Sequence, residues 1–185
     1  MRRKPRSKSV LIDPTRLSPL DEDQSTLQVI IETPKGSRNK YAFDPEQKVF
    51  SVKKVLPAGM SFPYDFGFIP STRAEDGDPT DVLVLMDEPA FPGVLVKCRV
   101  IGIIEGLQGK KKNGIRNDRI IAVEREHHSC AHVRHVKDLG KKFVKELEEF
   151  FVNYHALEGK KYRILDVKGP AEAHRRVNDG IKATR

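Results

Sequence analysis

The hexapeptide DGDPTD at residues 76–81 runs directly into the apolar segment VLVLM at residues 82–86. Gly77 frees the backbone, while Pro79 fixes φ and removes a hydrogen-bond donor, so the acidic residues must lie in a tight loop. The apolar run after them predicts a buried strand. We therefore expect a loop that holds three carboxylates close together at the start of a rigid strand.

Three carboxylates at this spacing repel one another, and each raises the pKa of its neighbours unless a cation neutralises them. Mg²⁺ and Mn²⁺ prefer such oxygen ligands. A calcium-binding EF-hand also begins with D-x-D, but it requires Gly and Glu where this chain has Asp81 and Asp87. An exposed acidic turn remains the alternative interpretation, because Asp, Gly and Pro are ordinary turn residues.

The composition is that of a soluble globular protein: 185 residues, 38% hydrophobic and 32% charged, with a net charge of +8. The positive charge favours an anionic partner, although part of it lies in the basic residues 1–8. No apolar run approaches the roughly 20 residues of a membrane span, and the N-terminal apolar run is too short for a signal peptide. We therefore expect a cytoplasmic protein with no membrane partner. Cys98 and Cys130 are too few for a disulfide framework, and Cys98 is expected to lie in a strand as a small apolar side chain.

The order of elements predicts strands first and helices last, which favours an α+β or barrel-plus-helices domain. Strands are expected at 27–33, 40–43, 49–56, 82–86, 94–104, 119–123 and 162–165. A long amphipathic helix is expected to begin near residue 137 or 138 and to end at Gly159, and a short helix follows at 170–183. Gly102 predicts a bulge, whereas residues 57–70 and 106–117 are expected to be loops, the second carrying Lys110, Lys111 and Lys112. Residues 1–24 are expected to form a mobile basic arm and linker, and residues 25–185 a single domain.

One acidic residue, three basic residues and one tyrosine from strand ends and the long helix are expected to surround the acidic loop. Cationic side chains beside metal-bound carboxylates are expected if the substrate carries more negative charge than the metal ions carry positive charge. Pyrophosphate is such a substrate. Divalent ions would lower the pKa of a bound water, a free aspartate would accept its proton, and Lys and Arg would neutralise the leaving phosphate. The residues are Glu32, Lys40, Lys54, Arg119 and Tyr154.

The DGDPTD loop and its apolar strand resemble the signature of the family I soluble inorganic pyrophosphatases, D-G-D-P-x-D followed by a strand. Weaker similarity extends over residues 27–168 and includes IETP at 31–34, PYDFGFIP at 63–70 and FFVNY at 150–154. The resemblance implies a small closed OB-type β-barrel with about two helices packed outside. It also implies Mg²⁺-dependent hydrolysis of pyrophosphate to two phosphates by a homo-oligomer.

The resemblance also implies roles for individual residues. Asp76 and Asp81 correspond to metal ligands, Glu32 to a carboxylate in or beside the metal site, and Asp78 to the general base or a partner that orients the attacking water. The phosphate ligands correspond to Lys40, Lys54, Arg119 and Tyr154.

Several positions depart from the family pattern. Two carboxylates expected near the barrel are amides, Gln108 and Asn117, and Asp118 is a metal ligand only if the strand shifts by one residue, because alternation otherwise points it away. The remaining departures are Ala42 for an acid, Lys54 for Arg, Phe62 and Phe66 for two tyrosines, Arg119 for Lys and His155 for Lys. These changes leave open a divergent active enzyme, a weakened one, or an enzyme for another phosphate anhydride.

Two other interpretations receive less support. Histidines and a cysteine between His127 and His135 have ligand chemistry, but their spacing fits no standard zinc pattern, so a surface loop is favoured. The basic arm and an OB-type barrel together suit a nucleic-acid-binding module. The aromatic residues cluster in one loop rather than along a basic strand face, and the acidic loop repels a phosphate backbone, so nucleic acid is not the expected partner.

Overall fold

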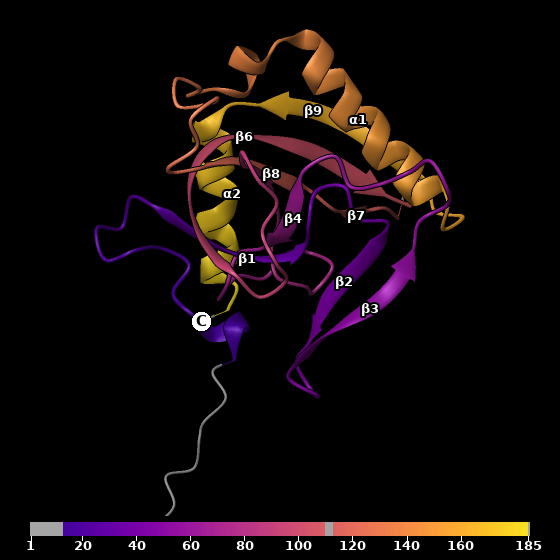
Figure 1. The fold of residues 1–185 in the computed structure, drawn as a ribbon, viewed down its shortest axis with the longest axis horizontal. Helices are drawn as coiled ribbons and strands as arrows, with labels where there is room; N and C mark the ends of the chain where they lie inside the picture. Colours follow the sequence, from indigo (N-terminus) through magenta and orange to yellow (C-terminus); the bar gives the residue numbers. More distant parts are fainter. Residues whose placement is uncertain (1–12, 110–112, 185) are drawn as a thin grey trace, which may run out of the picture.

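The computed structural model describes residues 13–109 and 113–184 and is shown in Figure 1. The strands are β1 Leu27–Thr33, β2 Asn39–Asp44, β3 Val49–Val55, β4 Asp65–Phe68, β5 Asp81–Leu85, β6 Leu95–Gln108, β7 Ile115–Arg116, β8 Arg119–Glu124 and β9 Tyr162–Lys168. The helices are α1 Lys141–Ala156 and α2 Pro170–Lys182, with 3-10 turns at Pro14–Arg16 and Val136–Leu139.

Five strands close into a barrel through the pairings β1–β4, β4–β5, β5–β8, β8–β6 and β6–β1. All of these pairs are antiparallel except β5–β8. β9 pairs with the far half of the long strand β6, and β2 and β3 form a separate hairpin that extends from the barrel (Figure 1). This arrangement confirms the predicted small closed barrel with helices packed outside.

Strand β5 reads as a continuous apolar run because both of its faces are buried. Val82 and Val84 belong to a core cluster that includes Ala173 and Val177 of α2. Leu83 and Leu85 belong to a second cluster that contains side chains of α1, among them Leu147 and Phe151. The acidic loop therefore ends at a strand that cannot shift without disturbing both clusters.

The residues 57–70 were predicted as a loop, but they contain β4. All four residues of β4 are buried, so the strand shows no alternation that sequence inspection can detect. A Cβ on Gly67 would lie 2.0 Å from the carbonyl oxygen of Ile30, so only glycine permits this close approach to β1.

Other boundaries differ by smaller amounts. β6 continues beyond Ile104 to Gln108, and its register shifts between Val100 and Gly102, which confirms the predicted bulge. Helix α1 begins at Lys141 rather than near 137, because a separate 3-10 turn ends at Gly140, where φ is 82°. Cys98 is buried in β6 as predicted.

Residues 13–24, predicted as part of the mobile arm, contact the barrel. The carbonyl of Thr15 accepts a hydrogen bond of 2.8 Å from the Ser71 amide, and Asp21 pairs with Lys97 at 2.6 Å. Residues 1–12 and the lysines at 110–112 lie outside the described residues. Among the described helices, none is long and apolar enough to cross a membrane.

Candidate active site

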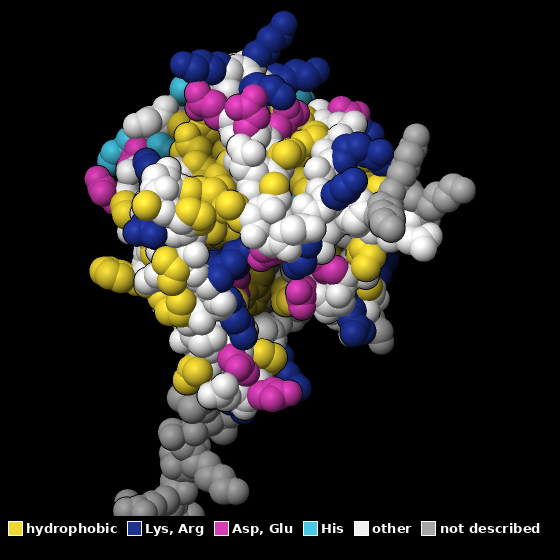
Figure 2. Space-filling model, turned by 90° about the vertical axis from the view of Figure 1, so that its right-hand side faces the viewer, with side chains coloured by type: hydrophobic (Ala, Val, Ile, Leu, Met, Phe, Trp, Pro, Cys, Tyr) yellow, Lys and Arg dark blue, Asp and Glu magenta, His cyan; other side chains and the backbone are white. Residues whose placement is uncertain are grey.

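A cleft of about 560 Å³ lies between the barrel, the β2–β3 hairpin and the end of α1. Figure 2 shows a hollow near the middle of the face that is drawn, with acidic and basic side chains intermingled around it. The charged side chains that line the cleft are Glu32, Lys40, Lys53, Asp76, Asp78, Asp81, Arg119, Glu158 and Lys160. The structure thus brings most of the sequence-predicted site residues to one concavity.

The acidic loop is stabilised by its own backbone. Gly77 has a φ of 94°, a left-handed conformation that side chains other than glycine rarely adopt, and the amide of Ala74 donates to the carbonyl of Asp78 at 2.8 Å. Asp76 and Asp78 are exposed at the cleft wall, whereas Asp81 is half-buried at the start of β5. The wall removes part of the hydration of the Asp76 carboxylate, and this loss raises its pKa, as do the negative charges of Asp81 and Asp78.

Asp81 is balanced by Arg119, the first residue of β8. Arg119 Nη1 lies 2.8 Å from the Asp81 carboxylate, and its side chain is only 6% exposed. The guanidinium also lies over the rings of Phe66 and Phe151, at 5.8 and 5.5 Å from their centroids. Burial raises the pKa of Asp81, and the charge of Arg119 opposes that rise. Arg119 is thus an internal cation on the barrel wall of the cleft.

The two amides that replace expected carboxylates bond to each other. Asn117 Nδ2 donates to Gln108 Oε1 at 2.8 Å, and Asn117 Oδ1 accepts from the guanidinium of Arg119. Both amides line the cleft. This part of the wall therefore presents neutral groups, already engaged, where acids would attract a cation.

Glu32 and Lys40 form a second pair at the base of the hairpin. Lys40 Nζ lies 3.0 Å from Glu32 Oε2, and the Phe43 amide donates to Glu32 Oε1 at 2.9 Å. Lys40 also lies 4.2 Å from the centroid of the Phe66 ring. The contact between β1 and β2 therefore orients the Lys40 ammonium group at the cleft wall.

Tyr154 and Lys54 meet at the opposite rim. Lys54 Nζ lies 3.6 Å over the Tyr154 ring and pairs with Glu158, which also binds Lys160 at 3.0 Å. Burial raises the pKa of the Tyr154 hydroxyl, so it is a hydrogen-bond donor at neutral pH. Lys54 is absent from the cleft lining, but it contacts Tyr154 and Glu158, which belong to that lining. The sequence did not single out Lys53, Glu158 or Lys160, since exposed charges beside a turn carry no distinctive pattern.

Asp118 is not placed with the other predicted ligands. Its carboxylate accepts hydrogen bonds from Arg116 at 3.1 and 3.0 Å and from the amide of Gly106 at 3.0 Å, and it lies 3.1 Å from Arg176 of α2. Strand alternation sends it to the side opposite Arg119. The position is structural, and Asp118 is not retained as a metal ligand.

The donor chemistry of the acidic loop fits a hard divalent cation. Its groups are oxygens, and the pKa of Asp76 is raised first by burial and then by the negative charges of Asp81 and Asp78, which a bound cation would offset. Within the described ranges, however, no three His, Cys, Asp or Glu side chains are gathered closely enough to hold a metal ion. A cation would therefore draw the carboxylates of this loop together when it binds.

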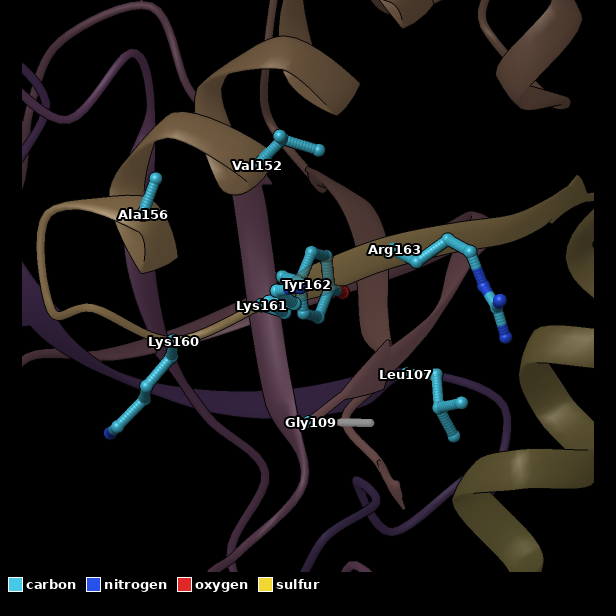
Figure 3. Close-up of a pocket in the computed structure, with 8 residues that line it drawn as sticks. All are labelled: Leu107, Gly109, Val152, Ala156, Lys160, Lys161, Tyr162 and Arg163. Atoms are coloured by element: carbon cyan, nitrogen blue, oxygen red, sulfur yellow. The ribbon is translucent and has the colours of Figure 1, made fainter. Parts of the chain in front are cut away.

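A second cavity of about 500 Å³ opens between α1, β6 and β9 (Figure 3). Its lining is apolar apart from basic side chains and Tyr162, whose ring lies at its centre in Figure 3. Of the described residues that line this cavity, none is acidic. The carboxylate-lined cleft is therefore the candidate active site.

Comparison with known proteins agrees with this assignment. The family model described as inorganic pyrophosphatase matches residues 29–185. An inorganic pyrophosphatase of Nostoc is 37% identical over 165 residues, covering 89% of this chain and 95% of that protein. One from Thermus thermophilus is 40% identical over 149 residues, covering 80% of this chain and 83% of that protein.

Among solved structures, the Thermus thermophilus inorganic pyrophosphatase has a TM-score of 0.83 at 34% identity, and the match covers 94% of this chain and 99% of that one. The Helicobacter pylori inorganic pyrophosphatase has a TM-score of 0.80 at 30% identity and covers 89% and 96%.

Proposed function

Because the chain belongs to the inorganic pyrophosphatase family, we propose that it hydrolyses inorganic pyrophosphate to two phosphates with Mg²⁺ as cofactor. The observation that carries this proposal is that the DGDPTD loop lines the same cleft as Lys40 and Arg119, two cationic residues whose side chains are mostly buried. Acidic and basic side chains are intermingled in the cleft, which suits a substrate that binds as an anion together with divalent cations.

The charges of the cleft favour a metal-dependent reaction. Five carboxylates and four cationic side chains line it, so the described lining does not by itself neutralise a substrate as anionic as pyrophosphate. Bound Mg²⁺ would supply the missing positive charge and lower the pKa of a water molecule. Asp76 and Asp81 would hold it, with Glu32 orienting Lys40 nearby. Mn²⁺ has the same ligand preference and is the alternative cofactor.

Asp78 is the proposed general base. It lines the cleft, and its carboxylate makes no hydrogen bond to another described side chain, so it is free to accept a proton from water. The water oxygen forms a bond to phosphorus while the bridging P–O bond breaks, and the second phosphate leaves with the bridging oxygen. Lys40, Arg119 and the Tyr154 hydroxyl stabilise the charge on the phosphate oxygens.

The amide pair at Gln108 and Asn117 leads us to propose that the metal is held from the acidic loop alone. This is a divergent form of the family's site, and its activity on other phosphate anhydrides is the second candidate function. The second candidate is favoured by two residues of the cleft lining, Phe62 and Phe66, whose rings carry no hydroxyl group. The cleft then has fewer hydrogen-bonding groups with which to distinguish pyrophosphate from a longer phosphate anhydride.

Phosphate release from pyrophosphate with Mg²⁺ and with EDTA tests the proposal. Asp78→Asn should lose most of its activity, because catalysis by a positioned base is worth about 10² to 10⁴-fold. Glu75→Gln is the matched control, since Glu75 lies in the same loop but outside the cleft lining. Equal rates for both variants would reject Asp78 as the base, and no Mg²⁺-dependent release from the unaltered protein would reject the function. Tripolyphosphate and ATP as substrates test the second candidate.

We further propose a cytoplasmic location, a homo-oligomer and a single domain at residues 25–185, against which residues 13–24 pack. Membership of the inorganic pyrophosphatase family supports the first two.

A further inference from the structure

Thr72 lies beneath the acidic loop and does not belong to the cleft lining. The residue is 5% exposed, and its hydroxyl makes two hydrogen bonds to the backbone. Oγ1 donates to the carbonyl of Ile69 at 2.6 Å and accepts from the amide of Thr80 at 2.9 Å. The Ile69 amide in turn donates to the Thr80 carbonyl at 3.0 Å. Both backbone groups of Thr80 are therefore held by residues 69–72.

The hydrogen bond between Thr72 and Thr80 closes residues 72–80 into a loop at its base. Asp76 and Asp78 lie within this loop, whereas Asp81 follows Thr80 directly. Two of the acidic groups thus lie on one side of the hydrogen bond in the chain and the third lies on the other. Thr72 therefore limits how far the two ends of the loop can separate.

Helix α2 supports this junction from outside the cleft, since none of its described residues belongs to the cleft lining. The Gly180 carbonyl accepts a hydrogen bond of 3.0 Å from the Arg73 amide. A Cβ on Gly180 would lie 2.9 Å from Thr80 Oγ1 and 3.3 Å from Thr72 Cβ. Glycine is unfavourable inside a helix, and here its missing side chain admits the two threonines. The Thr72 side chain is thus packed between α2 and the acidic loop.

The other end of the loop has few contacts. Among the described residues, the carboxylates of Asp76 and Asp78 make one hydrogen bond, from the Asp78 amide to Asp76 Oδ1 at 3.3 Å. The described carboxylates are not gathered closely enough to hold a metal ion, so a cation must draw them together. That rearrangement costs less free energy when part of the loop is already held in place.

We propose that Thr72 is a positioning residue that sets the Mg²⁺ affinity of the acidic loop. It holds the Asp81 end in place, while the end that carries Asp76 and Asp78 moves onto the cation. This inference rests on the proposed function, because it takes the acidic loop to be the metal site.

Calorimetric titration with magnesium chloride, in the absence of phosphate, tests the role of the hydroxyl. Thr72→Val keeps the shape of the side chain but removes Oγ1. Its Mg²⁺ dissociation constant should rise about three- to tenfold, as expected when one more side chain must be ordered on binding. Thr72→Ser keeps the hydroxyl and should bind Mg²⁺ like the unaltered protein, although the lost methyl group lowers its Tm.

Thr33→Val is the matched control. Thr33 is 0% exposed, and its hydroxyl bonds the carbonyl and amide of Tyr41 at 3.1 and 3.0 Å, at the base of the hairpin. This variant should lose Tm without a change in its Mg²⁺ dissociation constant. Hydrolysis of pyrophosphate supplies a second measurement. Thr72→Val should need more Mg²⁺ for its half-maximal rate, by the same factor as in the titration, and should reach the rate of the unaltered protein at saturating Mg²⁺.

The outcomes separate this inference from the proposed function. Equal Mg²⁺ affinity of Thr72→Val and the unaltered protein, or an equal loss in Thr72→Ser, would overturn the role of Thr72 and leave the function standing. The expected affinities without any hydrolysis of pyrophosphate would support the role of Thr72 and reject the function. No Mg²⁺ binding by the unaltered protein would overturn both.

Should Thr72→Val fail to fold, amide hydrogen exchange in the unaltered protein decides the matter. The Thr80 amide should be protected both in EDTA and in Mg²⁺, whereas the amides of Asp76 and Asp78 should gain protection when Mg²⁺ is added. A Thr80 amide that exchanges freely in EDTA, or no gain at Asp76 and Asp78, would overturn the inference.

Discussion

Replacing Arg119 with Met tests whether this residue is an internal cation in the acidic cleft. The substitution keeps an unbranched apolar chain beside Phe66 and Phe151 but removes the guanidinium. The Asp81 carboxylate then loses its 2.8 Å partner. Removing one partner of a buried ion pair costs about 3–5 kcal/mol. Because the Asp81 side chain is 26% exposed, we expect the lower end of that range.

Urea denaturation in EDTA measures the effect. A loss of about 3 kcal/mol corresponds to a decrease of roughly 6–12 °C in Tm for a chain of this size. Asp81→Asn combined with Arg119→Met should recover most of the loss, since the uncompensated charge is then gone. Mg²⁺ should stabilise Arg119→Met more than the unaltered protein, because a cation at Asp81 replaces the missing charge.

The pH dependence has a defined sign. Without Arg119, the pKa of Asp81 in the folded state rises further above its unfolded value. The destabilisation is therefore present at neutral pH and diminishes as pH falls through that raised pKa. A loss below about 1 kcal/mol in EDTA, the size expected for an exposed pair, or a loss that does not change with pH, would refute the reasoning.

Three further substitutions test other parts of the structure. Tyr162→Phe leaves the Asn117 carbonyl without its donor and should lower the free energy of unfolding in urea by about 1–3 kcal/mol; no change would show that the 2.7 Å bond is not stabilising. Gly67→Ala places a Cβ 2.0 Å from a backbone oxygen of β1 and should cost about 3 kcal/mol or more, seen as a lowered Tm or insoluble protein. Asp76→Asn removes a carboxylate whose pKa is raised in the fold, so in EDTA it should raise Tm at pH 8, with a gain that disappears as pH falls. In Mg²⁺ the same variant should show a smaller metal-dependent rise in Tm than the unaltered protein.

The sequence predicted most strands and both helices because their patterns are local. β1 and β3 alternate or are rich in β-branched residues, and the apolar face of α1 repeats at helical spacing. β4 was missed since all its residues are buried in contacts with strands distant in sequence. The barrel closure itself followed from the resemblance, not from any residue pattern.

The site residues were predictable where the chemistry of the residue type is enough to assign a role. They were not predictable where the role depends on the direction in which the side chain points. The acidic loop, Lys40 and Tyr154 were placed in the cleft because the strand and helix that bear them were recognised. Asp118 depended on one residue of register, which single-sequence reasoning does not fix. His155 was noted only as a substitution for Lys, since its tautomer follows from a contact to Phe151 that the sequence does not display.

Four of the departures from the family pattern, at Gln108, Asn117, Arg119 and His155, are connected in space. Gln108 bonds Asn117, Asn117 bonds Arg119, and the backbone of Asn117 holds the Tyr162 hydroxyl that lies beside His155. Along this connected set, Arg119 is the one formal charge at neutral pH, because burial lowers the pKa of His155 to about 4. The proposed divalent cation is therefore expected at the DGDPTD loop, whose three carboxylates line the cleft. Under the proposed function, we therefore expect cations on the side of the acidic loop, phosphate oxygens near Lys40 and Arg119, and the attacking water beside Asp78. This connected set of substitutions thus predicts the direction in which pyrophosphate would bind.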